Sequence, residues 1–165
     1  MELRKHLNPK TIFIGLYVVA FLGYVIYGLQ PAEAAYSYEI VEELQIPSIA
    51  LDSDVTELQL ASDGLKTPDT IVGSYSRNAN KTLLIGHSTT VFQDLEYVDL
   101  EDTVVYGGQE YRVVAIDMVA KNKINMDKLL QSSEKDTLII MTCAGKLLDD
   151  GDATHRLILT AISRV

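Results

Sequence analysis

The stretch Thr137–Ala161, TLIIMTCAGKLLDDGDATHRLILTA, decides the fold of the chain. It predicts an apolar strand over 137–142, a polar loop, and a second apolar strand over 157–162. Cys143 stands at the end of the first strand, and Arg156 opens the second strand thirteen residues later. If the two strands pair, Cys143 and Arg156 lie near the same end of a sheet.

Cys143 is the only cysteine in the chain, so it has neither an internal disulfide partner nor a second thiolate with which to share a metal. Free cysteines are most often small buried hydrophobic residues, and this stretch alone leaves a structural role and a reactive one equally open. A strand end suits a nucleophile, because the sheet holds the backbone while the side chain meets solvent or substrate.

Composition limits the functional classes. A chain of 165 residues has room for one domain and a short appendage, and an apolar fraction of 47% is normal for a chain that buries a core. The net charge of −9 argues against nucleic-acid binding. No phosphate-loop, dinucleotide, CxxC or HExxH motif occurs, so no cofactor and no metal are predicted. Asp149, Asp150 and Asp152 lack the spacing of a calcium loop and are interpreted as a solvated acidic loop.

The N-terminal region predicts a membrane anchor. Thr11–Leu29 holds nineteen residues without a charge, which as a helix span about 28 Å, close to the thickness of a bilayer core. Arg4, Lys5 and Lys10 precede this run and acidic residues follow it. By the positive-inside rule the N-terminus is cytoplasmic and the remainder of the chain is extracellular.

A cleaved signal peptide is the competing interpretation, because Ala32-Glu33-Ala34 fits an A-x-A cleavage site. The apolar run is longer than the 7–15 residues typical of a signal peptide, which favours a retained anchor. The predicted organisation is a cytoplasmic N-terminus at 1–10, a single-pass transmembrane anchor at 11–29, an extracellular linker at 30–44 and an extracellular domain at 45–165.

The extracellular domain is predicted to be mainly β. Short β-like runs separated by turn residues recur from Leu44 onward. Strands are expected at 46–50, 55–60, 81–86, 103–106, 111–117, 137–142 and 157–162, with one short helix within 125–132 and a helical turn at 92–95. Many short strands with little helix predict a closed or nearly closed β-barrel.

His87 provides a third candidate beside Cys143 and Arg156. A lone histidine at a strand end is more often a surface residue than a catalyst. All three residues, however, stand where an apolar strand meets a polar loop. A nucleophilic cysteine needs a proton acceptor nearby, for which histidine is the usual partner, and an arginine is a permanent donor for an oxyanion or a substrate carbonyl.

The order of these residues resembles the sortase family of membrane-anchored cysteine transpeptidases. The most specific matches are Leu84-Ile85-Gly86-His87, Phe92-Gln93-Asp94-Leu95, Met141-Thr142-Cys143 and Arg156-Leu157-Ile158. The family's TLxTC signature is only partly kept, since Thr142-Cys143 matches but the residues before them differ. Glu101-Asp102 stands where the family often has Gly-Asp.

The resemblance implies a closed eight-stranded sortase β-barrel with one or two short helices. Cys143 would attack the Thr–Gly carbonyl of an LPXTG-like sorting signal, and His87 would protonate the departing glycine amine. Arg156 would hold the signal and stabilise the oxyanion, and Thr142 and Ser88 are candidates for substrate contact. The thioacyl intermediate would pass to an amine on a peptidoglycan precursor or to a pilin lysine.

Two other functions compete with this one. An L,D-transpeptidase also uses cysteine, histidine and arginine, but histidine and glycine directly precede its cysteine, which Met141-Thr142-Cys143 does not match. The other alternative is a membrane-tethered β-barrel binding module in which Cys143 is structural. His155 is a weaker candidate for the base, because it lies in the loop before the second strand.

Overall fold

The computed structural model describes residues 38–61, 64–149 and 152–164. The predicted cytoplasmic segment 1–10, the anchor 11–29, the alternative cleavage site and most of the linker 30–44 lie outside this part of the chain. Within the described residues, no helix combines the length and the apolar character that crossing a membrane requires.

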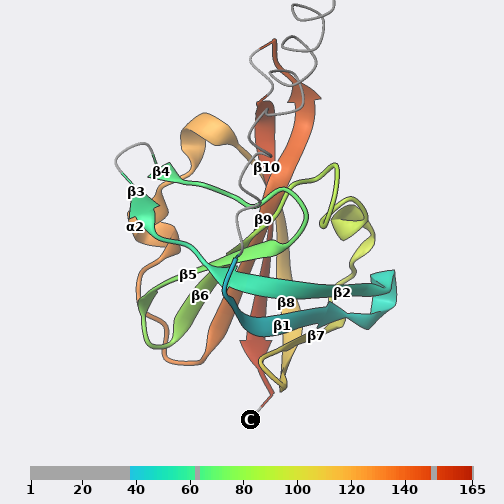
Figure 1. Cartoon of the computed structure of the whole chain (residues 1–165), viewed down its shortest axis with the longest axis vertical. Helices are drawn as coiled ribbons and strands as arrows, with labels where there is room; N and C mark the ends of the chain where they lie inside the picture. The colour runs from blue at the N-terminus through green and yellow to red at the C-terminus, as the bar shows by residue number, and fades with distance from the viewer. Residues whose placement is uncertain (1–37, 62–63, 150–151, 165) are drawn as a thin grey trace, which may run out of the picture. The chain divides into compact units, whose positions relative to one another are not determined.

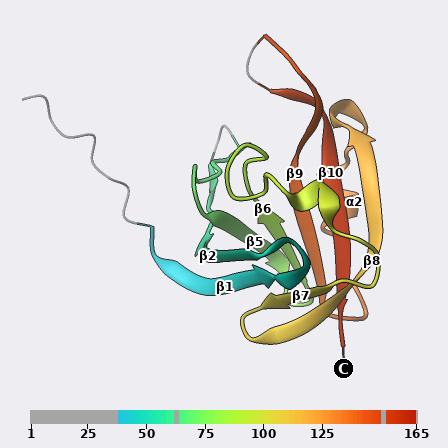
Figure 2. The same ribbon diagram turned by 90° about the vertical axis from the view of Figure 1, so that its right-hand side faces the viewer.

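Eight strands form a closed barrel in the order β1-β2-β5-β6-β9-β10-β8-β7 (Figures 1 and 2). The strands are β1 (Ile40–Ile46), β2 (Leu51–Glu57), β5 (Val72–Asn78), β6 (Lys81–Ile85), β7 (Thr103–Tyr106), β8 (Gln109–Ala120), β9 (Thr137–Leu147) and β10 (Ala153–Ser163). Two short strands, β3 (Leu60–Ala61) and β4 (Gly64–Leu65), pair separately. The predicted mainly β, closed eight-stranded barrel is confirmed.

The deciding stretch forms the β9–β10 pair. The two strands are antiparallel and Arg156 is the direct partner of Cys143, so the predicted proximity of these residues is confirmed. Figure 2 shows β9 and β10 side by side along the barrel wall. β6 runs parallel to β9 on its other side, with Ile85 opposite Met141. His87, two residues after Ile85, therefore follows β6 at the level of Cys143.

β9 is apolar on both faces because each face packs against other side chains. Successive residues of a strand point to opposite faces. Leu138 and Ile140 belong to the main core cluster, whereas Ile139 and Met141 belong to a second cluster that includes Leu130. A strand buried on both sides has a continuous apolar run rather than an alternating one, which explains TLIIM.

Helical segments are few. One α-helix, α2 (Met126–Leu129), and three 3-10 helices, η1 (Pro47–Ile49), η2 (Leu95–Tyr97) and η3 (Lys121–Lys123), occur among the described residues. Asn125 caps α2, because its Oδ1 accepts a hydrogen bond of 3.0 Å from the Lys128 backbone N–H. Figure 1 shows α2 beside β3 and β4, at one side of the barrel. The short helix expected within 125–132 is confirmed, over fewer residues.

Two expectations about boundaries are wrong. The segment 46–50 is not a strand: Pro47, which has no N–H to donate, begins η1, and Ala50 ends it in a left-handed conformation with φ of 51°. The linker was expected to extend to 44, but β1 begins at Ile40 because this segment pairs with β2. The helical turn expected at 92–95 is confirmed, because the Leu95 N–H donates to the Phe92 carbonyl at 3.3 Å, and η2 follows it directly over Leu95–Tyr97.

The strand expected at 55–60 also begins earlier, at Leu51, and ends at Glu57. Its first half is polar in sequence, yet Ser53 is buried while Asp52 and Asp54 are exposed. Alternating burial of this kind is typical of a strand with one face toward the core. A core-facing position is usually recognised in a sequence by a large apolar residue. Here the residue is a small serine, so the start of the strand was missed.

Candidate active site

A pocket of about 510 Å³ lies against the outer face of the barrel wall. His87, Cys143 and Arg156 line it together. His87 lies two residues after the end of β6, but Cys143 lies within β9 and Arg156 within β10. The prediction that Cys143 and Arg156 stand at strand ends is wrong, because both strands extend beyond the apolar runs 137–142 and 157–162. The structure therefore places the three predicted site residues around one cavity, although 56 and 13 sequence positions separate them.

Away from these residues the pocket becomes apolar and then charged. Its middle is formed by Ile85 and Met141 on the strands, with Leu130 opposite, which belong to the second apolar cluster or pack against it. Arg77 on β5 and Asp127 on α2 line its far part and form an ion pair of 2.5 Å. The pocket thus combines an apolar middle with a polar group at each end.

Two hydrogen bonds join the segments that carry His87 and Cys143. The backbone N–H of Gly86 donates to the Met141 carbonyl at 3.4 Å. The Thr142 hydroxyl donates to the Gly86 carbonyl at 2.8 Å. Gly86 directly precedes His87 and Thr142 directly precedes Cys143, so the hydroxyl bond joins the backbones that present the two candidate side chains. Cys143 itself is only partly buried and lines the pocket.

The loop after β6 turns sharply at His87. The His87 carbonyl accepts hydrogen bonds from the backbone N–H groups of Thr90 at 3.3 Å and Phe92 at 3.0 Å. Gly86 permits this turn to pack closely, because a Cβ at this position would lie 2.6 Å from the buried Phe92 ring. The close approach explains why the motif LIGH is followed by an aromatic residue at position 92.

The His87 ring faces partly toward solvent, with 43% of its side chain exposed. Its Nε2 lies 3.8 Å from Asp69 Oδ1. The Asp69 segment is tied to the same loop, since the Thr90 hydroxyl donates to the Asp69 carbonyl at 2.6 Å.

Arg156 is held by residues just before it in the chain. One terminal nitrogen, Nη1, donates to the carbonyls of Ala153 at 3.0 Å and His155 at 2.9 Å. The other, Nη2, donates to Asp152 Oδ1 at 2.7 Å. Only 15% of the arginine side chain is exposed. The guanidinium is therefore fixed at the edge of the pocket.

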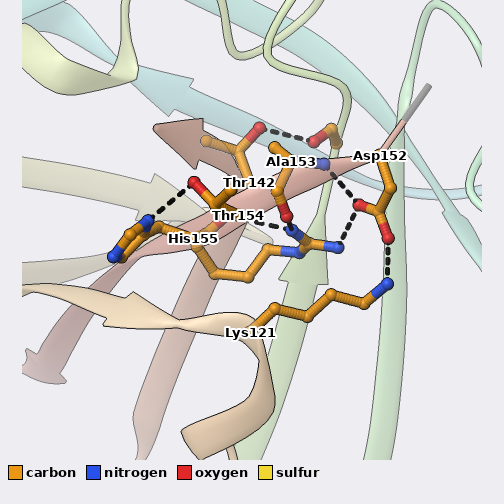
Figure 3. Close-up of polar contacts among 8 residues, drawn as sticks. Lys121, Thr142, Asp152, Ala153, Thr154 and His155 are labelled. Carbon is orange, nitrogen blue, oxygen red and sulfur yellow. Dashed lines mark hydrogen bonds and ion pairs between the residues drawn. The ribbon is translucent and has the colours of Figure 1, made fainter. Parts of the chain in front are cut away.

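Asp152 is in turn bound by a second cation, Lys121, through its Oδ2, a contact that Figure 3 shows. The hydrogen bond from Lys121, the backbone N–H of Ala153 and the guanidinium of Arg156 hold the pKa of the Asp152 carboxyl well below its usual value. The carboxylate is therefore ionised at neutral pH.

Of the other residues that the sequence singled out, Thr142 lines the pocket, whereas Ser88 and His155 do not. Thr142 lines the pocket, but its hydroxyl is directed to Gly86. Ser88 is not among the described residues that line the pocket. Substrate contact by either residue stays a prediction. The His155 ring does not line the pocket, and its Nδ1 lies 2.8 Å from the Thr154 hydroxyl (Figure 3).

Sequence reasoning missed three residues of this region. Asp152 was interpreted as one member of a solvated acidic loop, and only the loop geometry distinguishes it from Asp149. Arg77 and Asp127 are separated by fifty positions, and no local signal in the sequence pairs them. Within the described residues, no group of three or more histidine, cysteine, aspartate or glutamate side chains is arranged to hold a metal ion.

The Sortase domain family model matches residues 44–163, which is most of the chain. The chain belongs to the sortase family. This membership supports cysteine transpeptidase chemistry on sorting-signal substrates in general. No curated protein sequence matches the chain.

Solved sortase structures share the fold. The lid mutant of sortase A from Corynebacterium diphtheriae superimposes with a TM-score of 0.62 at 22% identity, covering 86% of this chain and 79% of that one. Sortase C2 of Pilus Island 1 from Group B Streptococcus superimposes with a TM-score of 0.60 at 18% identity, covering 77% of this chain and 75% of that one. Sortase A from Listeria monocytogenes superimposes with a TM-score of 0.60 at 13% identity, covering 76% of this chain and 88% of that one. At these identities the likeness establishes the barrel and not the substrate.

Proposed function

We propose that this sortase cleaves an LPXTG-like sorting signal between threonine and glycine and transfers the new carboxyl end to an amine acceptor. The acceptor is an amine of a peptidoglycan precursor or a pilin lysine. The observation that carries the proposal is the single pocket that Cys143, His87 and Arg156 line together.

In the first half-reaction the Cys143 sulfur attacks the threonine carbonyl carbon. A C–S bond forms and the carbonyl oxygen becomes an oxyanion, which the Arg156 guanidinium stabilises. Cys143 and His87 share one proton, and this proton is on His87 once the sulfur has attacked. His87 gives it to the glycine nitrogen as the C–N bond breaks, so a neutral amine leaves and a thioester remains.

In the second half-reaction the acceptor amine attacks the thioester carbon. Neutral His87 takes the proton that the amine loses as the new amide forms, and the C–S bond breaks to return Cys143. A thioester reacts with an amine much faster than an amide does, so the first half-reaction stores the acyl group in a transferable form. The same histidine acts as an acid and then as a base, and no cofactor takes part in either half-reaction.

The lining of the pocket supports an extended peptide with apolar residues before the scissile bond. Ile85, Met141 and Leu130 offer an apolar surface next to Cys143, which suits the leucine and proline of an LPXTG-like signal. The partial exposure of Cys143 inside a pocket argues against the binding-module alternative, in which this thiol is a core residue.

The location belongs to the same proposal. We infer that residues 11–29 anchor the protein in the cell membrane, with the N-terminus in the cytoplasm and the barrel outside. The uncharged nineteen-residue run and the basic residues before it support this arrangement. An extracellular barrel would meet both the sorting signals of secreted proteins and cell-wall precursors.

The test uses the full chain in detergent, a panel of fluorogenic LPXTG-type peptides and a small amine acceptor. We expect cleavage and a new amide product with at least one peptide, and loss of both in Cys143→Ala, His87→Ala and Arg156→Ala. His155→Ala and Arg164→Ala are matched controls outside the pocket and should retain activity. Absence of product with every peptide would overturn the proposal, as would full activity in Cys143→Ala.

A further inference from the structure

We propose that Asp152 is a positioning residue that holds the Arg156 guanidinium in its working orientation, and that Lys121 fixes Asp152 for this purpose. The inference rests on the proposed transpeptidase function and adds two residues to it. Neither residue lines the pocket, so both act through Arg156.

The first argument is the geometry of the arginine. Three of its N–H groups are bound by residues just before it: one by Asp152 at 2.7 Å and two by the backbone carbonyls of Ala153 and His155. A guanidinium carries five N–H groups in one plane, so fixing three of them fixes the direction of the other two. The two remaining groups are available to a substrate carbonyl or to an oxyanion.

The second argument is the position of Asp152 between two cations. Its Oδ1 binds Arg156, and its Oδ2 binds Lys121 at the end of β8. Lys121 follows Ala120, whose partner in β10 is His155, so the ammonium reaches the loop across the strand pair. The carboxylate is 24% exposed, and its backbone neighbour Ala153 donates a further hydrogen bond of 2.7 Å. Each oxygen of Asp152 is thus committed to a separate cation.

The third argument is charge. One carboxylate alone beside Arg156 would cancel the charge that stabilises the oxyanion. Because Lys121 shares the same carboxylate, the three side chains keep a net charge of plus one. The cluster can therefore hold Arg156 in place without removing its electrostatic contribution.

The experiment measures kcat and KM for the full chain with the best peptide of the panel. Asp152→Asn keeps the shape of the side chain and removes its charge. Misplacing a catalytic group by about 1 Å costs on the order of 100-fold, so we expect kcat/KM to fall about 10- to 100-fold, mainly in kcat. Lys121→Met should cause a smaller decrease, and the double variant should be no worse than Asp152→Asn alone.

Asp149→Asn is the matched control, because Asp149 is an exposed aspartate of the same loop. It should leave kcat/KM unchanged. A second readout is independent of turnover: the NMR signals of the Arg156 guanidinium, assigned with Arg156→Lys, should show restricted rotation in the wild type and free rotation in Asp152→Asn. Lys121→Met provides the same comparison if Asp152→Asn does not fold.

Unchanged kcat/KM in Asp152→Asn, or equal guanidinium rotation in both proteins, would overturn the inference. A higher kcat/KM in that variant would also overturn it, because Asp152 would then compete with the substrate for Arg156. If the wild type gives no product with any peptide, the proposed function fails, and the guanidinium signals still decide whether Asp152 holds Arg156.

Discussion

Glu101 shows how one backbone angle explains a departure from the family pattern. Its φ is 74°, in the left-handed region that costs a non-glycine residue roughly 1–2 kcal/mol. The family often has glycine here, which adopts this conformation freely. Contacts of Glu101 offset the cost of this backbone conformation. Arg112 Nη1 donates to both Glu101 carboxylate oxygens at 2.9 and 2.7 Å, and the Glu101 N–H donates to the Val113 carbonyl.

Two substitutions at this position should therefore differ in stability. Glu101→Ala and Glu101→Gly both lose the ion pair with Arg112, but only glycine removes the backbone strain. We expect the free energy of unfolding in urea to be higher for Glu101→Gly than for Glu101→Ala by about 1 kcal/mol. Equal stability, or the reverse order, would contradict the strain argument.

The Thr142 hydroxyl is the second feature at this scale. It links the residue before Cys143 to the residue before His87 through the Gly86 carbonyl, and it is buried. Thr142→Val keeps the shape but removes the donor, which leaves a buried carbonyl without this bond. We expect a loss of about 1–3 kcal/mol in unfolding free energy together with lower activity. Thr142→Ser restores the donor and should recover most of both; a Val variant as active as the wild type would argue against this role.

At the scale of elements, the Arg77–Asp127 pair joins β5 to α2 across the far part of the pocket. The strand register gives the distance between this ion pair and His87. Ser76, next to Arg77, pairs with Thr82 on β6, and Thr82 lies five positions before His87. At about 3.3 Å per residue this is roughly 16 Å along the strands. A substrate would contact this pair with residues remote from the scissile bond.

Remote contacts bind the ground state and the transition state equally, which changes KM rather than kcat. We therefore expect Arg77→Ala to raise KM severalfold for peptides long enough to reach the pair, with kcat almost unchanged. Shortened peptides should show no difference between the two proteins. Lys128→Ala removes a neighbouring cation outside the pocket lining and is the control; a change in kcat for Arg77→Ala would refute the assignment.

The whole molecule responds to pH partly through Asp152. Its pKa is lowered in the folded state from the usual 3.8, first by the hydrogen bond from Lys121 and then by Ala153 and Arg156. A carboxylate of lowered pKa stabilises the fold above its unfolded pKa, and this contribution is lost as pH falls through the folded pKa.

The difference in Tm between the wild type and Asp152→Asn should therefore be constant at neutral and mildly acidic pH. It should shrink progressively as pH falls below the usual value of 3.8. Differential scanning calorimetry over this range measures both proteins under identical conditions. A difference that stays constant down to the acid limit of folding would mean that Asp152 is not stabilised by these cations.

The sequence predicted the barrel, and it predicted three residues that lie around one pocket, for identifiable reasons. The apolar run before Cys143 and the one after Arg156 are the most buried parts of β9 and β10, although both strands extend past these two residues. His87 was identified in the same way, and the LIGH motif carried the family resemblance. These signals are local, so a single sequence contains them.

The features that could not be predicted depend on distant contacts or on loop geometry. Asp149 and Asp152 look equivalent in the sequence, and only the path of the loop brings Asp152 between Arg156 and Lys121. The start of β1 was missed because Ile40–Glu43 is exposed, and its pairing with β2 decides the boundary. Pro47 fits either a strand end or a 3-10 helix.

The most direct test of the account is the mass of the enzyme after reaction with an LPXTG-type peptide in the absence of an amine acceptor. We predict that the wild-type chain gains the mass of the acyl fragment, and that peptide mapping locates this mass on Cys143. Cys143→Ala should gain nothing, and added amine should release the adduct as a new amide. An unmodified Cys143 under conditions in which the peptide is cleaved, or a thiol that reacts only after unfolding, would contradict the claim that Cys143 is the nucleophile.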